Sequence, residues 1–163
     1  MSGFTSQIIH LGEARLVFPL IRELVPGLGL KDWMQFARYA TNPRRAEENG
    51  IVAVTRHGRA MPCGLFLYRR ERQLSGKAVL VAEHFVALDV LDAQPVLDAL
   101  VEELDALARR LSCDATRVLV PGEASLLRAG LQAAGHATTG VTLGKAVPHE
   151  AVCAAVPETS SRH

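Results

Sequence analysis

One carboxylate in an otherwise apolar stretch is the strongest candidate for proton-transfer chemistry. Glu83 lies within AVLVAEHFVAL, residues 78–88, and a carboxylate in partly apolar surroundings can act as a general base near neutral pH. We therefore interpret Glu83 as a candidate catalytic base. The alternative is a strand residue that faces solvent or forms an ion pair. His84 follows it, but neighbouring side chains of a strand point to opposite faces, so we expect no carboxylate–imidazole pair.

The cysteines and histidines predict neither a metal site nor a disulfide framework. Cys63, Cys113 and Cys153 are far apart and lack CxxC spacing, so they are better interpreted as small buried hydrophobic residues than as ligands or a catalytic thiol. None of the six histidines stands at a helical or hairpin spacing from another type of metal ligand. We predict no bound metal, and we expect His136, at the end of a predicted helix, to contact backbone carbonyls.

Charge and hydropathy exclude several partners. Lys and Arg number 18 against 17 Asp and Glu, a formal net charge of +1, whereas nucleic-acid-binding domains usually carry a basic surface. The basic cluster RRER at 69–72 could meet phosphates or an acidic partner, although a solvated turn is the usual interpretation. The sequence lacks an apolar run of about 18 residues and a signal-peptide layout at residues 1–10. We therefore expect a cytoplasmic protein without nucleic-acid or membrane partners.

The elements that must position these residues begin with a strand and two helices. Residues 4–10 (FTSQIIH) predict a strand. Apolar residues at helical spacing predict a helix over 13–25, which Pro19 either kinks or restarts. A second short helix is predicted over 31–40, where the apolar residues share one face.

The middle of the chain predicts antiparallel strands. Residues 51–55 and 61–68 have the composition of a hairpin, and residues 69–76 form a charged turn. The long apolar run over 78–88 predicts a strand whose two faces are both covered. Three consecutive antiparallel strands are therefore expected.

The second half begins with the clearest helix of the sequence, over 94–111, in which leucines recur every three or four residues. Residues 116–120 predict a short strand parallel to the one before this helix. A helix over 123–134 and a strand or hairpin over 138–147 follow, while the tail at 148–163 lacks any apolar period.

This succession of elements resembles the GNAT N-acyltransferases over residues 4–147. VAEHFVA at 81–87 resembles the strand that often carries the family's catalytic carboxylate. The hairpin over 50–68, with Gly64 midway along its second strand, resembles the family's second and third strands. LLRAGLQAAGH at 126–136 resembles its fourth helix.

The resemblance implies an α/β (α+β) fold in which about four helices flank a mixed central sheet of about six to seven strands. The length and even composition predict one domain over 1–147, and the composition of 148–163 predicts a disordered or loosely docked tail. The implied activity is acyl-CoA-dependent N-acyl transfer, with acetyl-CoA or another acyl-CoA as cosubstrate, a small-molecule or protein amine as acceptor, and Glu83 as the base. A homodimer or a protein partner is left open. The positions that the resemblance places against coenzyme A are Phe85, Val86, Ala87, Leu88, Ala93, Gln94 and Val96.

Residues 88–97 (LDVLDAQPVL) depart from the family's Arg/Gln-x-x-Gly-x-Gly/Ala loop, because they contain no glycine, lysine or arginine. Asp89, Asp92 and Asp98 cluster where the family binds the coenzyme A pyrophosphate. Leu131 stands near the position of the family's frequent tyrosine acid. We therefore predict weak binding of coenzyme A. The alternative function is a GNAT-shaped binding or scaffold module that has lost coenzyme A and acts through a protein partner.

Overall fold

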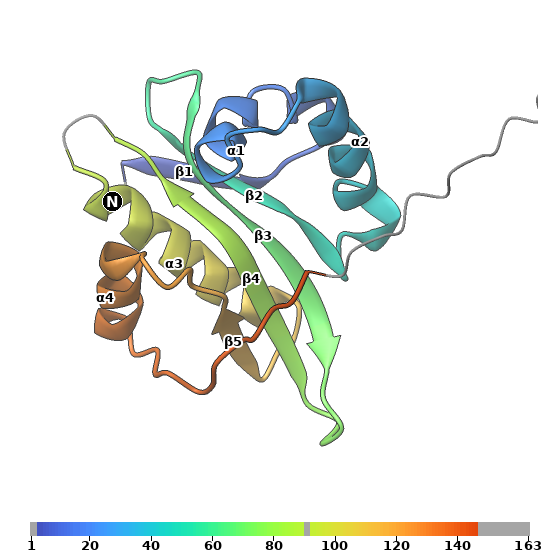
Figure 1. Cartoon of the computed structure of the whole chain (residues 1–163), viewed down its shortest axis with the longest axis vertical. Helices are drawn as coiled ribbons and strands as arrows, with labels where there is room; N and C mark the ends of the chain where they lie inside the picture. The colour runs from blue at the N-terminus through green and yellow to red at the C-terminus, as the bar shows by residue number, and fades with distance from the viewer. Residues whose placement is uncertain (1–2, 90–91, 147–163) are drawn as a thin grey trace, which may run out of the picture.

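A mixed five-stranded sheet is the framework of the described structure. The computed structural model describes residues 3–89 and 92–146 (Figure 1). The first four strands pair antiparallel in sequence order, and the fifth runs parallel to the fourth. This arrangement confirms the predicted α/β fold class and the parallel strand after the long helix. The strands are β1 (Phe4–Ile8), β2 (Asn49–Arg56), β3 (Pro62–Arg72), β4 (Ala78–Ala87) and β5 (Ala115–Val118).

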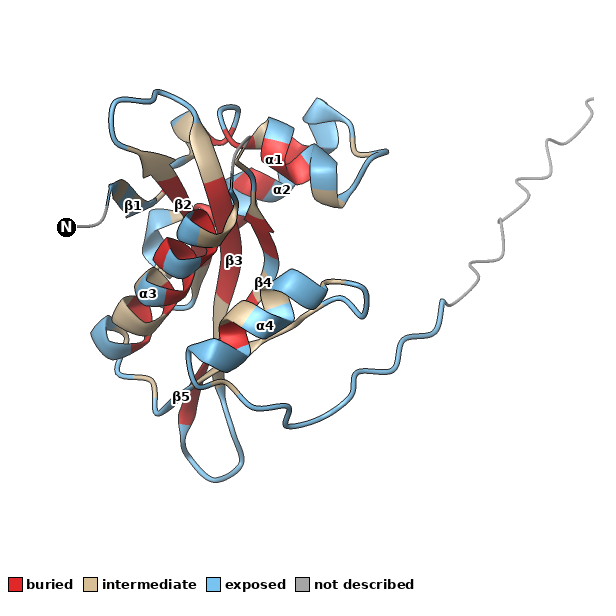
Figure 2. Cartoon of the chain, turned by 90° about the vertical axis from the view of Figure 1, so that its left-hand side faces the viewer, coloured by how far each residue is buried: buried red, intermediate tan, exposed pale blue. Residues whose placement is uncertain are grey.

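Two pairs of helices cover the two faces of this sheet (Figures 1 and 2). The helices α1 (Phe18–Leu24) and α2 (Leu30–Ala40) pack on one face, and α3 (Gln94–Arg110) and α4 (Ser125–Ala133) pack on the other. Each face buries its own hydrophobic cluster. Two short 3-10 helices, η1 (Leu11–Glu13) and η2 (Pro43–Arg45), lie in the connections.

The leucine stripe of α3 forms the centre of one cluster, as its spacing predicts. Leu97, Leu100, Leu104 and Leu107 are all buried against the sheet, and each buried leucine contributes about 1.5–3 kcal/mol relative to an exposed one. The helix lies directly on the backbone of β3, since a Cβ added at Gly64 would come within 2.7 Å of a methyl group of Val96. Figure 2 shows this buried stripe of α3 facing the sheet.

Proline and glycine set two of the helix boundaries. Pro19 lies in the first turn of α1, so it starts the helix instead of kinking it, and the helix predicted over 13–25 is shorter than expected. Gly135 adopts a φ of 94° directly after α4, a conformation that favours glycine and ends a helix.

A bulge in β4 changes which side chains face which helices. His84 has a φ of 55°, and the register between β3 and β4 shifts at this point. Ala82 before the bulge and Phe85 after it both belong to the cluster under α3, while Val86 belongs to the cluster under α1 and α2. Because Glu83 is adjacent to Ala82 in the strand, its side chain lies on the α1 and α2 face.

The predicted turn at 69–76 is partly wrong, because β3 continues to Arg72. Two of its charged residues, Arg69 and Glu71, form ion pairs in the sheet, among them the pair between Arg69 and Glu83 of β4. The turn itself begins at Gln73, whose backbone N–H donates to the carbonyl of Lys77 at 2.9 Å.

The predicted strand or hairpin over 138–147 is not formed, because residues 138–146 have no regular structure. Val141 and Leu143 are 86% and 91% exposed. A strand is stable only beside a bonded neighbour, and Gly140 and Gly144 weaken this segment further because they have no side chain to pack. The described sheet therefore has five strands, fewer than expected, and the predicted tail at 148–163 lies outside the described residues.

Candidate active site

β4 and β5 diverge halfway along β4, and this leaves an opening at one edge of the sheet. Their ladder ends at the pair of Ala82 and Val118, and one more bond joins the Leu119 N–H to the carbonyl of Ala82 at 2.9 Å. β4 continues to Ala87, whereas the chain after β5 turns away at Pro121 into α4. The bulge at His84 lies where the two strands separate.

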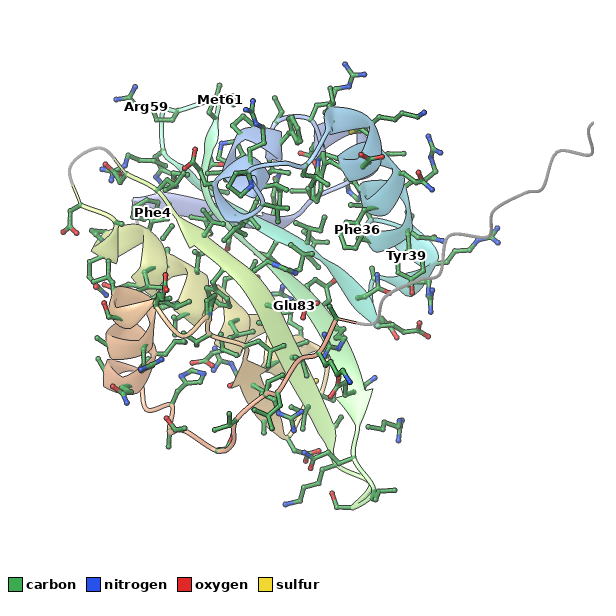
Figure 3. All side chains as sticks on the ribbon, viewed as in Figure 1. Phe4, Phe36, Tyr39, Arg59, Met61 and Glu83 are labelled. Atoms are coloured by element: carbon green, nitrogen blue, oxygen red, sulfur yellow. The ribbon has the colours of Figure 1, made fainter. Side chains whose placement is uncertain are left out.

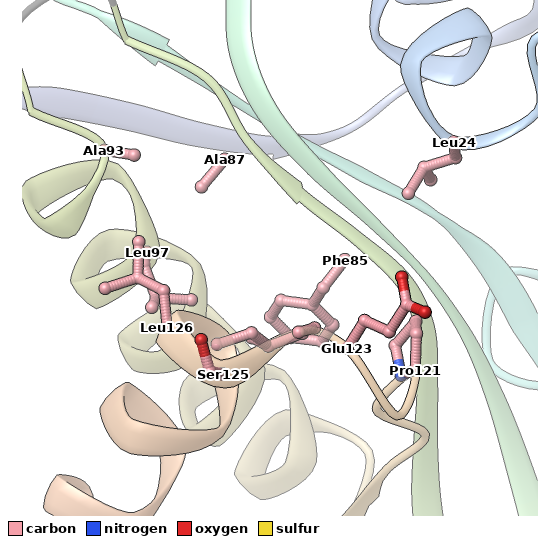
Figure 4. A pocket seen from close by; sticks show the side chains of 11 residues that line it. Leu24, Phe85, Ala87, Ala93, Leu97, Pro121, Glu123, Ser125 and Leu126 are labelled. Carbon is pink, nitrogen blue, oxygen red and sulfur yellow. The ribbon is translucent and has the colours of Figure 1, made fainter.

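A cavity of about 320 Å³ fills this opening (Figure 4). Four elements contribute to its wall: the end of α1, the end of β4, the start of α3, and the turn between β5 and α4. The lining residues are Leu24, Phe85, Ala87, Ala93, Leu97, Pro121, Glu123, Ala124, Ser125, Leu126 and Leu127.

The cavity connects the two faces of the sheet. Leu24 packs against the cluster under α1 and α2, whereas Leu97 belongs to the cluster under α3, and both line the same cavity. Phe85 fixes the wall between them by stacking on Phe66 with ring centroids 5.0 Å apart. Two reactants that approach from opposite faces could therefore meet at the end of β4.

The wall is apolar except at the turn before α4. Glu123 supplies the one carboxylate among the lining residues and Ser125 the one hydroxyl. Glu123 is exposed, and among the described residues its side chain has no ion-pair partner. Neither residue stands out in the sequence, because PGEAS between a short strand and a helix has the composition of an ordinary turn. Only the three-dimensional closure of that turn onto β4 reveals their position.

Glu83, labelled in Figure 3, lies on β4 beside the opening and forms an ion pair. Its Oε2 accepts a hydrogen bond from Nη1 of Arg69 at 2.9 Å, and its side chain is 30% exposed. Arg69 also donates to Glu71, which accepts a bond from Arg117. The pKa of Arg69 is raised, first by the hydrogen bond to Glu71 and then by Glu83. Oε1 of Glu83 accepts no hydrogen bond from the described residues, so it is open to a ligand.

The positions that the family resemblance places against coenzyme A are only partly brought together. Phe85, Ala87 and Ala93 line the cavity. Leu88 is 42% exposed, and its N–H donates to the carbonyl of Cys63 at 2.8 Å.

Three further positions lie outside the lining set. Gln94 is at the start of α3, where its Nε2 donates to Oδ1 of Asp98 at 2.7 Å. Val86 and Val96 are buried in the two hydrophobic clusters, one on each face of the sheet. Their side chains hold the fold around the cavity and do not form its wall.

The aspartates at the start of α3 are all engaged by this chain. Asp92, one residue before the N-cap Ala93, accepts a bond from the Gln94 N–H, the first N–H of α3, at 2.9 Å. Asp89 forms an ion pair with Arg56, and Asp98 accepts from Gln94. The acidic loop seen in the sequence is therefore held by hydrogen bonds and an ion pair around this helix end.

No tyrosine of the described residues reaches the cavity as a proton donor. Tyr68 donates its hydroxyl hydrogen to the carbonyl of Ala46 at 2.7 Å, and burial raises its pKa to about 12. Leu131 is buried in the core. The protic side chains of the described wall are therefore the carboxyl group of Glu123 and the hydroxyl of Ser125.

The remaining candidate side chains have structural positions. Burial raises the pKa of the Cys63 thiol, which disfavours the reactive thiolate. His136 contacts the carbonyl of Leu131 through Nδ1 at 3.2 Å and the hydroxyl of Thr116 through Nε2 at 3.1 Å, and the backbone contact is the one expected.

The residues at 3–89 and 92–146 contain no group of three or more potential metal ligands. Over the same ranges, no helix is both long and apolar enough to cross a bilayer.

Solved acetyltransferase structures share this architecture. Glucosamine-6-phosphate N-acetyltransferase from Arabidopsis thaliana matches with a TM-score of 0.71 at 13% identity, over 89% of this chain and 99% of that one. Ribosomal-protein-alanine N-acetyltransferase from Brucella melitensis biovar Abortus 2308 matches with 0.71 at 14% identity, again over 89% and 99%. The aminoglycoside N-acetyltransferase AAC(6')-Iy, solved with CoA, matches with 0.74 at 12% identity, over 90% and 96%.

Sequence comparisons find no counterpart, since no protein-family model and no curated protein matches the chain. The similarity is therefore one of fold, and it extends over nearly the whole length of each neighbour. This structural similarity shows that the chain has the GNAT acyltransferase fold. The bulge in β4, the divergence of β4 from β5 and the helix pairs on both faces agree with it.

Proposed function

We propose that the protein transfers an acyl group, most simply acetyl, from a thioester to an amine. The observation that carries this proposal is the cavity between the diverging β4 and β5, which is lined from both faces of the sheet. Holding two reactants in reacting geometry is the main requirement of direct acyl transfer. The acyl thioester arm would occupy the apolar cavity, and the amine would approach from the α1 and α2 face.

Glu83 is the proposed general base. The amine nitrogen attacks the thioester carbonyl carbon, so a C–N bond forms and the C–S bond breaks. The amine loses a proton toward Oε1 of Glu83, since Oε2 is held by Arg69, and the departing thiolate takes its proton from solvent. The ion pair with Arg69 fixes the direction of the carboxylate, as an orienting partner does for a catalytic base.

The amine acceptor is proposed only as a class. Three of the structural neighbours are an aminoglycoside, a glucosamine-6-phosphate and a ribosomal-protein-alanine N-acetyltransferase, which span small-molecule and protein amines. Two acidic side chains, Glu83 beside the opening and Glu123 in its wall, would favour an acceptor that arrives as a cation.

A second function is favoured by one observation, the carboxylate of Asp92 on the first N–H of α3. If this contact prevents the binding of any thioester, the fold would serve as a binding module for a protein partner. The two functions differ in whether turnover occurs.

The test is product formation with the full chain. It is incubated with acetyl-CoA at millimolar concentration and with amines of the three neighbour classes: an aminoglycoside, glucosamine 6-phosphate, and a peptide with N-terminal alanine. Release of free thiol together with a mass increase of one acetyl group on an amine supports the proposal. Thiol release at the rate of the protein-free control, with every amine and also with acetyl-pantetheine, would leave the binding module as the better account.

A further inference from the structure

We infer that the acyl donor is held through its acyl-pantetheine arm, and that the diphosphate of coenzyme A contributes no binding energy in this protein. This inference rests on the proposed function for the class of ligand. It concerns the part of the donor that the chain recognises, and the start of α3 and the cavity wall are the features that carry it.

The N-terminus of α3 has few N–H groups left for an anion. An α-helix leaves its first N–H groups without intrahelical partners, and these groups bind phosphates in many proteins. Here the N–H of Gln94 already donates to Asp92 at 2.9 Å, Pro95 has no N–H, and Val96 is fully buried in the core. The Leu97 N–H is bonded within the helix to the carbonyl of Ala93.

The charge around this helix end is also already balanced. The carboxylate of Asp92 lies where an anion would benefit from the helix dipole. Arg56, a basic residue beside the loop, is engaged by Asp89, and residues 88–97 contain no lysine or arginine. A diphosphate at this position would therefore meet carboxylates and no free cation of the loop.

The cavity, in contrast, suits a short and mostly apolar arm. Its volume of about 320 Å³ is at the small end of the range of ligand pockets, about 300–1,000 Å³. Leu97, Leu126 and Leu127 provide apolar wall, and Ser125 with the free edge of β4 provides hydrogen-bonding groups for amides. Glu123 is the charged lining residue, and its sign disfavours a phosphate there too.

Coenzyme A and pantetheine share the arm and differ in the nucleotide and its phosphates. The experiment compares two unreactive thioethers, S-ethyl-coenzyme A and S-ethyl-pantetheine, by calorimetry with the full chain at low salt. We expect dissociation constants that agree within about threefold, since electrostatic contacts to phosphate are the part that would separate them. If the coenzyme A thioether binds more than about tenfold more tightly than the pantetheine thioether, the inference is overturned. A tenfold difference in dissociation constant is about the contribution of one charge-assisted contact. Failure of both thioethers to bind at millimolar concentration would overturn it as well.

A variant that removes one negative charge near the start of α3 gives a second test of how the two thioethers bind. Asp92→Asn keeps an oxygen that can accept from the Gln94 N–H but removes the negative charge, so it should tighten the coenzyme A thioether about two- to fivefold, the usual worth of one charge at a helix N-terminus. Binding of the pantetheine thioether should not change. The matched control is Asp105→Asn, which makes the same charge change farther along α3 and should affect neither ligand. Loss of coenzyme A binding in Asp92→Asn alone would contradict the inference.

This test is separate from that of the proposed function. If the two thioethers bind equally but no acyl transfer occurs, the inferred donor site is supported and the proposed acyltransferase activity is refuted. If acyl transfer from acetyl-CoA occurs and coenzyme A binds much more tightly than pantetheine, the acyltransferase activity is supported and the inference about the diphosphate is refuted.

Discussion

At the scale of single residues, the account depends on two carboxylates that lie near the same opening. Glu83 is oriented by Arg69 on the α1 and α2 face, and Glu123 lines the cavity itself. A base must be within hydrogen-bonding reach of the attacking amine, and the two residues would serve amines that approach along different paths. Substituting each residue in turn therefore shows from which face of the sheet the amine approaches.

The Glu83→Gln substitution keeps the size of the side chain and removes the base. We expect kcat to fall at least about 100-fold at neutral pH, because general-base catalysis contributes about 100- to 10,000-fold. Glu123→Gln is the matched control and should lower kcat less than about tenfold. The measurement is the initial rate of thiol release with saturating donor and amine. If kcat falls more in Glu123→Gln than in Glu83→Gln, the base is Glu123 and the amine enters through the cavity.

The Cys63 thiol should be slow to react. Burial raises its pKa, so at any pH below that value the folded protein holds less thiolate than an exposed cysteine does, and thiolate is the nucleophile. We expect iodoacetamide to alkylate Cys63 more slowly in the folded protein than in urea at pH 8, with the folded rate still rising as the pH increases past the range of ordinary thiols. Peptide mass spectrometry after timed alkylation measures both rates. Equal rates in the two states would show that the thiol is neither buried nor perturbed.

At the scale of elements, the sequence predicts best what is local. The leucine spacing of α3 places four buried residues on one stripe, and Pro19 and Gly135 mark helix ends because their backbone preferences act within one turn. The alternation of side chains along β4 holds only up to the bulge, since Ala82 and Phe85, on its two sides, both face α3. The bulge at His84 could not be predicted, because a φ of 55° at a histidine is imposed by the register with β3.

Features that depend on distant partners were harder to predict. β3 is longer than expected, because Arg69 finds acidic partners in its own and the neighbouring strand and so stays in the sheet. The segment over 138–147 has strand-like composition, but residues 138–146 do not pair with β5. In both cases the deciding interaction is between strands, which composition alone does not show.

The contact between α3 and β3 gives a stability test at this scale. A Cβ at Gly64 would lie 2.7 Å from Val96, 3.0 Å from Leu100 and 3.1 Å from the carbonyl oxygen of Val86, so Gly64→Ala should overpack the interface and lower the free energy of unfolding by about 1–3 kcal/mol. Gly12→Ala is the control, since a Cβ there meets no atom within 4 Å, and its effect should be within about 0.5 kcal/mol. Urea titration measures both. A Gly64→Ala variant as stable as the parent would mean that α3 does not rest on β3 this closely.

At the scale of the whole molecule, the function depends on how the sheet opens. Four elements from separate parts of the sequence meet around one cavity, and none of them carries a recognisable motif for thioester binding. The sequence could therefore predict the fold and Glu83 as the candidate base, while Glu123, Ser125 and the shape of the cavity needed the folded chain. The start of α3 lacks the glycines and basic residues of the family's phosphate loop, and the first N–H of this helix is bonded to the carboxylate of Asp92.

Acyl transfer is proposed to take place in the opening between β4 and β5, so a side chain that fills this opening should block the reaction. Ser125 is exposed and lines the cavity, so Ser125→Phe should place a ring in the opening without disturbing the core. Ala133→Phe is the matched control, because it adds a similar ring at the exposed far end of the same helix.

The measurement is the rate of acyl transfer for the parent chain and these two variants, with the melting temperature of each recorded to confirm folding. We expect acetylated amine from the parent and from Ala133→Phe, and a loss of about 100-fold in kcat/KM for Ser125→Phe, since displacing a reactant by about 1 Å can cost that factor. Equal rates in a folded Ser125→Phe variant, or no acetylated amine from the parent, would contradict this expectation.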